Sequence, residues 1–298
     1  MNNTTVEHNH AHNSTKNIKT AFFLNVGFTI FELVGGLWTN SVAILADAIH
    51  DLGDSLSLGL AWFLQNYSKK DSDDKYTYGY ARFSLLGALI NTLVLITGSL
   101  FILSEAIPRL MTPEESNAPG MILFAIVGIV VNGIAAFRLK GDQTMNAQVV
   151  TWHLLEDVLG WIAILIAGII LLFVDIPIID PILAILFTLY ILYNVVKNLQ
   201  VTLSLFLQSS PNNIDIDKIV DQFLQIEGVL SSHHTHLWSL DGENHVLTTH
   251  LIIVEKANKD DIIQIKRAVR KILGNLNITH LTLEIEYENE KCRMKEEK

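Results

Sequence analysis

The chain has 298 residues, of which 50% are hydrophobic and only 17% are charged. A soluble domain of this length would carry more charge, about a quarter of its residues. The formal net charge of −10 argues against nucleic acid as a partner, because phosphate binding needs basic patches. The single cysteine, Cys292, excludes a disulfide framework and any zinc site built from several cysteines.

Residues 1–16 form a polar N-terminal tail without the pattern of a secretory signal peptide. The tail contains three alternating histidines, His8, His10 and His12. Tracts of this kind collect soft cations weakly. The tail therefore either feeds metal ions to the rest of the protein or is a dispensable solvated segment.

Six long apolar segments follow between residues 17 and 208. A helix needs about 20 mostly apolar residues to cross a bilayer. The segments that meet this requirement are Ala21–Trp38, Ser41–Asn66, Phe83–Ile107, Pro119–Phe137, Ala147–Val174 and Ile178–Phe206. The sequence thus predicts a transmembrane domain of six helices over residues 17–208.

The basic residues around these spans predict their orientation. Nine Lys or Arg residues flank the spans on the side of the N-terminus, and Arg109 stands alone on the other side. Loops rich in Lys and Arg remain in the cytoplasm. We therefore expect both termini to be cytoplasmic.

Residues 209–288 have the mixed polarity of a small soluble domain. Helical spacing and strand alternation predict the order helix, strand, strand, helix, strand. The predicted elements are Ile214–Glu227, Ser232–Leu240, Asn244–Val254, Lys259–Leu273 and Thr279–Tyr287. This order predicts an α+β fold with a small open sheet and two helices on one face. Residues 289–298 form a charged C-terminal tail.

Ionisable residues inside the predicted spans are candidates for function, because charge is costly in a bilayer. The second span carries His50 and Asp54, and the fifth carries His153 and Asp157. Each pair has i, i+4 spacing, so its members lie on one helix face. Two such helices would offer two imidazoles and two carboxylates. That set suits tetrahedral Zn²⁺ better than Ca²⁺ or Mg²⁺, which prefer more oxygen ligands.

Other interpretations of these polar residues stay open. The two pairs could line a water-filled cavity or bind one another without metal. Asp47, Asp51 and Glu156 either support the site or form structural hydrogen bonds. Glu32 and Asn132 are candidates for polar contacts between helices.

Four motifs resemble those of the cation diffusion facilitator family. They are Leu45–Asp54 in the second span, His153–Asp157 in the fifth, Tyr78–Arg82 before the third, and His236–Leu240 in the soluble domain. The likeness extends from about residue 17 to 287. It implies a homodimeric metal/proton antiporter in the bacterial inner membrane, with a metallochaperone-like cytoplasmic domain.

The resemblance also implies roles for individual residues. His50, Asp54, His153 and Asp157 match the family's transport site, and a histidine at position 50 resembles the zinc-preferring members. His233, His250 and Glu284, with Glu286 close by, fall at positions that can bind regulatory metal, although a set of solvated surface histidines would look the same. Tyr76 stands where members often have a histidine, so we predict no metal site in that loop.

Together these features predict a secondary transporter that exports Zn²⁺, with Cd²⁺, Co²⁺ and other divalent transition metals as further candidates, in exchange for protons. Zinc would be the substrate and a candidate regulatory ligand, with no prosthetic group. The alternative is a membrane metal receptor or sensor that does not transport. An intramembrane metalloprotease is disfavoured because the chain has no His-Glu-x-x-His motif.

Overall fold

The structure is a computed structural model that describes residues 4–68, 70, 72–139 and 145–290. Contacts divide the chain into two units. The first lies within Met1–Tyr67 and Leu86–Leu199, and the second within Ser68–Leu85 and Gln200–Lys298. The charged C-terminal tail predicted for residues 289–298 falls mostly outside the described residues.

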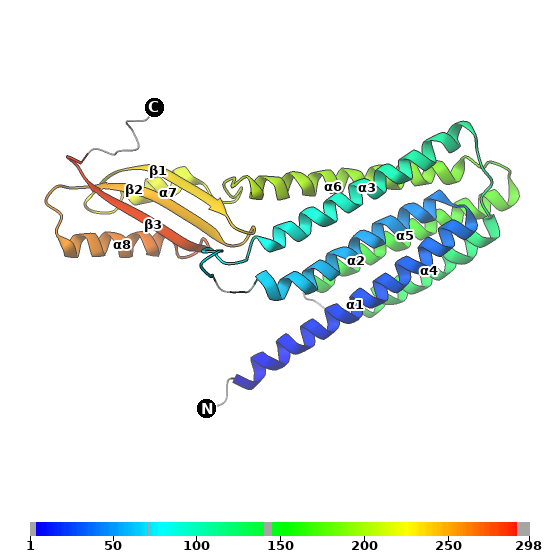
Figure 1. The fold of residues 1–298 in the computed structure, drawn as a ribbon, viewed down its shortest axis with the longest axis horizontal. Coiled ribbons are helices and arrows are strands. Elements are labelled where there is room, and N and C mark those ends of the chain that lie inside the picture. Colours follow the sequence, from blue (N-terminus) through cyan, green and yellow to red (C-terminus); the bar gives the residue numbers. More distant parts are fainter. Residues whose placement is uncertain (1–3, 69, 71, 140–144, 291–298) are drawn as a thin grey trace. The chain divides into compact units, whose positions relative to one another are not determined.

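Six long helices dominate the first unit (Figure 1). They are α1 (Thr4–Thr39), α2 (Val42–Ser68), α3 (Phe83–Met111), α4 (Ala118–Leu139), α5 (Met145–Phe173) and α6 (Ile179–Phe206). Among the described residues, five of these helices are long and apolar enough to cross a membrane. The remaining helix, α2, has 27 residues and interrupts its apolar sequence with Asp47, Asp51 and Asp54. The six-helix architecture predicted from hydropathy is confirmed.

The interior of this bundle is apolar and close-packed. Trp161 of α5 is completely buried, and its indole ring occupies the space that a Cβ atom on Gly128 of α4 would need. Phe28 of α1 meets the same indole edge to face, at 6.3 Å between ring centroids. Phe137 and Phe173 stay 77% and 80% exposed on the outside. Apolar residues on both the inside and the outside are typical of helices that contact lipid.

Two helices extend beyond the predicted spans. α1 begins at Thr4, and its apolar stretch, Phe22–Thr39, is only its C-terminal half. The side chains of the histidine tract lie outside the described residues. α3 continues through Pro108 to Met111, whereas the sequence analysis ended it before the proline. Proline lacks the N–H that would donate to Ser104 O, but the Pro108 carbonyl still accepts from Thr112 N at 2.9 Å.

The second unit is the small α+β domain that the sequence predicted. Its elements are α7 (Ile216–Leu224), β1 (Val229–Ser239), β2 (His245–Ile253), α8 (Lys259–Leu273) and β3 (Ile278–Tyr287). The strands lie in the order β1-β2-β3, with β1 antiparallel to β2 and β3 parallel to β2. The crossover between the parallel strands is α8, whose predicted limits agree with the observed ones.

Local signals in the sequence explain how these elements begin and turn. Asn258 caps α8: its Oδ1 accepts from Asp261 N at 3.1 Å, and Asp261 Oδ2 accepts from Asn258 N at 2.8 Å. This reciprocal pair is a capping box. Between β1 and β2, Asp241 accepts from Asn244 N at 2.7 Å while Gly242 takes a φ of +101°. Only glycine adopts that conformation without strain.

The two faces of the sheet have different roles. Both helices pack against one face, where Phe223 and Val269 meet alternate β2 residues such as Leu247 and Leu251. Since successive strand residues point to opposite sides, His250 of β2 points away from this core. The helix-free face is therefore where polar chemistry can be placed.

The connection between α2 and α3 is also part of the second unit. Asp73 accepts hydrogen bonds from the Tyr80 hydroxyl and from the backbone N–H groups of Lys75 and Tyr76. These donors hold the pKa of the Asp73 carboxyl well below its usual range. Tyr78 packs edge to face on His280 of β3, with 4.9 Å between ring centroids. The described part of this loop is thus ordered by its own hydrogen bonds and by β3.

Candidate metal centre

The four polar residues predicted for the second and fifth spans come together between α2 and α5. His153 Nε2 lies 2.8 Å from Asp54 Oδ2, and His50 Nε2 lies 3.7 Å from the same oxygen. His153 Nε2 is also 3.9 Å from Asp157 Oδ2. The two imidazole rings are 5.5 Å apart and nearly perpendicular. One atom each from His50, Asp54 and His153 fits within 4.8 Å, and Asp157 borders this group.

These distances are close to those of a tetrahedral zinc site. Zn²⁺ binds nitrogen and oxygen ligands at about 2.0–2.2 Å, which places neighbouring ligand atoms about 3.3 Å apart. The observed separations of 2.8, 3.7 and 3.9 Å lie on both sides of that value. His50, Asp54 and His153 already offer three ligand atoms within 4.8 Å of one another, and Asp157 would have to move closer to complete a four-ligand site.

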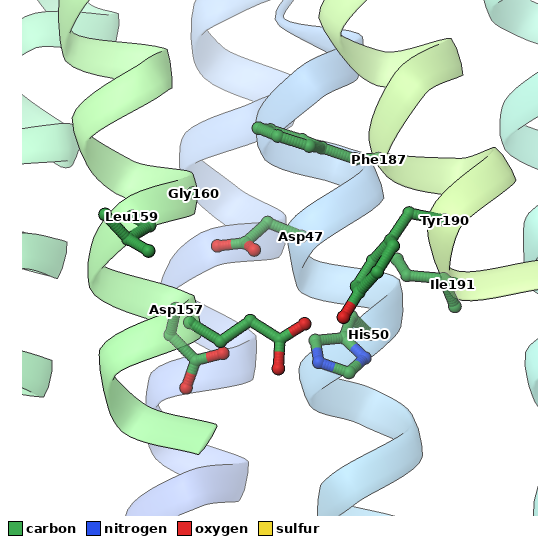
Figure 2. Close-up of a pocket in the computed structure, with 9 residues that line it drawn as sticks. Asp47, His50, Asp157, Leu159, Gly160, Phe187, Tyr190 and Ile191 are labelled. Atoms are coloured by element: carbon green, nitrogen blue, oxygen red, sulfur yellow. The ribbon is translucent and has the colours of Figure 1, made fainter. Parts of the chain in front are cut away.

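A cavity of about 330 Å³ opens beside these ligands (Figure 2). It is bounded by Asp47 and His50 of α2, Glu156 and Asp157 of α5, and residues of α6. Tyr190 of α6 reaches into the same space. The cavity lining combines carboxylates and an imidazole, which suit a cation, with apolar residues such as Phe187 and Ile191.

The other polar residues predicted in the spans are buried, with the exception of Glu156. Asp47 and Asp51 are buried on α2, and Glu32 of α1 is completely buried. Asn132 is buried on α4. Glu156 is exposed on α5, next to Asp157. Tyr190 lines the cavity but has no signal in the sequence, because an aromatic residue in an apolar helix looks like an ordinary packing residue.

A second group of candidate ligands lies on the helix-free face of the sheet. Glu286 of β3 places Oε1 2.7 Å from His250 Nδ1 and Oε2 3.2 Å from His233 Nε2. The two imidazole rings have centroids 5.1 Å apart. Among the described residues, two groups offer three potential ligand atoms within 4.8 Å of one another. One is His50, Asp54 and His153, and the other is His233, His250 and Glu286.

The two glutamates contact opposite sides of one imidazole. Glu286 approaches Nδ1 of His250, whereas Glu284 Oε2 lies 3.4 Å from Nε2. The Glu284 side chain is 64% exposed and that of Glu286 only 7%. One ion cannot bind both nitrogens of a ring, so the observed rotamers group His233 and His250 with Glu286 rather than with Glu284.

Comparison with known proteins agrees with this architecture. Residues 18–207 match the family described as the cation efflux transmembrane domain. The chain is 33% identical over 287 residues to a cadmium, cobalt and zinc/H(+)-K(+) antiporter of Bacillus velezensis, covering 94% of this chain and 91% of that protein. It is 32% identical over 288 residues to the zinc transporter ZitB of Pectobacterium atrosepticum, covering 94% and 89%.

A solved structure is also similar over part of the chain. It is the metal-bound C-terminal domain of the CzcD transporter from Cuprividus metallidurans, at 27% identity and a TM-score of 0.22. The match covers 24% of this chain and 99% of that domain.

The fold and the matches define a multi-pass membrane transporter for metal cations rather than an enzyme. The chain belongs to the cation efflux family, also called the cation diffusion facilitators.

Proposed function

We propose that this protein exports Zn²⁺ from the cytoplasm in exchange for protons, through a site formed by His50, Asp54, His153 and Asp157. The observation that carries the proposal is that α2 and α5 bring these side chains together: Asp54 Oδ2 lies beside both histidines, and Asp157 Oδ2 lies 3.9 Å from His153 Nε2. Cd²⁺ and Co²⁺ are further candidate substrates, because geometry and availability set selectivity more than raw affinity does. Relatives of this chain are named for transport of these three metals.

The ligand chemistry connects metal movement to proton movement. Metal binds imidazole nitrogen and carboxylate oxygen only in their deprotonated forms, so zinc binding releases protons. In the structure His153 Nε2 faces Asp54 Oδ2 at 2.8 Å, and zinc would replace this contact with two bonds to the ion. When the site faces the opposite side, returning protons would expel the metal and restore the contact. Rocking of the helices between the two states would provide alternating access.

We also propose an orientation, a membrane and an oligomeric state, the last of which rests on the family resemblance. Both termini would lie in the cytoplasm, as the distribution of Lys and Arg predicts, and the membrane would be the bacterial inner membrane. The working unit would be a homodimer. A second zinc ion bound by His233, His250 and Glu286 would act as a regulatory ligand of the cytoplasmic domain, with Glu284 as a further candidate ligand.

Zinc flux into proteoliposomes under an imposed pH gradient tests this function. Wild type would be measured beside Asp157→Ala, which removes a buried carboxylate of the site, and Asp175→Ala, which removes an exposed one between α5 and α6. We expect gradient-driven uptake in wild type and in Asp175→Ala, and none in Asp157→Ala. Zinc binding without flux in wild type would favour the receptor alternative, and flux in Asp157→Ala would refute the proposed site.

A further inference from the structure

Asp180 is a completely buried carboxylate at the start of α6. Its oxygens contact the beginning of α2. Asp180 Oδ1 accepts from the Ser41 hydroxyl at 2.5 Å and from Ala43 N at 3.3 Å, and Oδ2 accepts from Val42 N at 2.7 Å.

These bonds complete the N-terminus of α2. The first N–H groups of a helix have no partner inside the helix, and they carry partial positive charge. Ser41 is the local cap, since its hydroxyl oxygen accepts from Ile44 N at 3.2 Å. Asp180 supplies the acceptors for Val42 and Ala43 from a helix that begins 137 residues later. The first turn of α2 is therefore fully satisfied only when α6 is docked against it.

The turn before α2 is fixed by other elements. Asn40 takes a left-handed φ of +53°. Arg109 of α3 donates to the Asn40 backbone oxygen and to its side-chain oxygen, both at 3.0 Å. Asn117 N donates to Thr39 O at 2.8 Å. The end of α1 and the start of α2 are thus held by α3, by the connection to α4, and by α6.

We propose that Asp180 is a positioning residue for the metal centre, which sets the rotation and height of α2 relative to α6. This inference rests on the proposed function. His50 and Asp54 follow Val42 on the same continuous helix, about 12 and 18 Å along its axis at 1.5 Å per residue. A slip of α2 by one residue would turn both side chains by about 100°, away from His153. A cap that prevents this slip keeps the ligands aligned with α5.

The contacts distinguish this role from a role as proton carrier or metal ligand. Both carboxylate oxygens of Asp180 already accept hydrogen bonds from α2. Asp180 is absent from the cavity lining and from the clusters of metal ligands found among the described residues. Its influence on zinc is therefore transmitted through α2.

The test compares zinc-dependent flux of Asp180→Ala and Asp180→Asn with wild type, and Asp175→Asn serves as a control from the same connection. Asp180→Ala leaves two buried N–H groups unpaired. We expect its zinc concentration for half-maximal flux to rise roughly tenfold, the lower end of the range for residues that orient metal ligands. Asp180→Asn keeps one of the two acceptor oxygens and replaces the other with an NH2 donor. It should therefore be impaired less than Asp180→Ala and keep its pH profile.

A purely structural role would lower the amount of folded transporter, and with it the maximal flux, without moving half-saturation. An unchanged half-saturation in folded Asp180→Ala would overturn the inference. So would an Asp180→Asn variant that is as impaired as Asp180→Ala or that has a displaced pH profile. If Asp180→Ala does not fold, Ser41→Ala provides a second variant, because it removes one hydrogen-bond donor to Asp180. It should raise the zinc concentration for half-maximal flux by a smaller factor than tenfold. No rise in that concentration would contradict the proposal. Absence of flux in wild type would instead refute the proposed function.

Discussion

Replacing each of the two glutamates of β3 with glutamine should separate their roles in the cytoplasmic metal site. Glu286 faces both histidines from a buried position, at 2.7 and 3.2 Å. An interaction of this kind with a charged partner contributes about 1.5–3 kcal/mol. Glu286→Gln should therefore weaken zinc binding at this site between about tenfold and about a hundredfold.

Glu284 should matter much less. It makes one contact of 3.4 Å with His250 from a largely exposed position. Exposed ion pairs contribute roughly 0–1 kcal/mol because solvent screens them. Glu284→Gln should accordingly weaken binding by no more than about fivefold.

The assay is a zinc titration of the full-length protein in detergent. An Asp157→Ala background would suppress the membrane site, so that the remaining high-affinity step reports the cytoplasmic domain. The two glutamine variants conserve volume and serve as controls for each other. Equal losses, or a greater loss in Glu284→Gln, would show that the rotamers in the structure do not describe the metal-bound site.

Two further predictions concern the stability of the cytoplasmic domain. Phe223→Ala should lower the domain's free energy of unfolding by about 3–5 kcal/mol, because the ring is completely buried between α7 and the sheet. The measurement is a denaturant titration. The control is Leu224→Ala, which should lower the free energy far less because Leu224 is 43% exposed. Burial lowers the pKa of His245 below its usual value of about 6.5, with Asp241 opposing the shift. The unfolded chain then binds the proton more readily, so the stability contributed by neutral His245 is complete above pH 6.5 and is lost as the pH falls below it. The melting temperature of the domain should fall between pH 7.5 and pH 5. In His245→Leu it should fall less steeply with pH. An equally steep fall in this variant would refute the role given to His245.

The sequence by itself determined the features that depend on local periodicity. Runs of about 20 apolar residues reveal spanning helices whatever their neighbours are. The i, i+4 spacing of His50 with Asp54 and of His153 with Asp157 places each pair on one face of any helix. The predicted limits of α8, Lys259–Leu273, agree with the observed ones, since a helix end satisfies its backbone groups with nearby residues.

The tertiary structure decided which residues meet across elements. β1 has a register irregularity between His233 and His236, and His234 has a φ of +46°, so simple alternation cannot show which histidine faces Glu286. Alternation places Glu284 and Glu286 on the same face of β3, and only the rotamer of His250 separates them. The cap that Asp180 provides joins α2 to a helix far away in the sequence. A long-range hydrogen bond leaves no periodic trace in the chain, because its geometry exists only once the helices have packed.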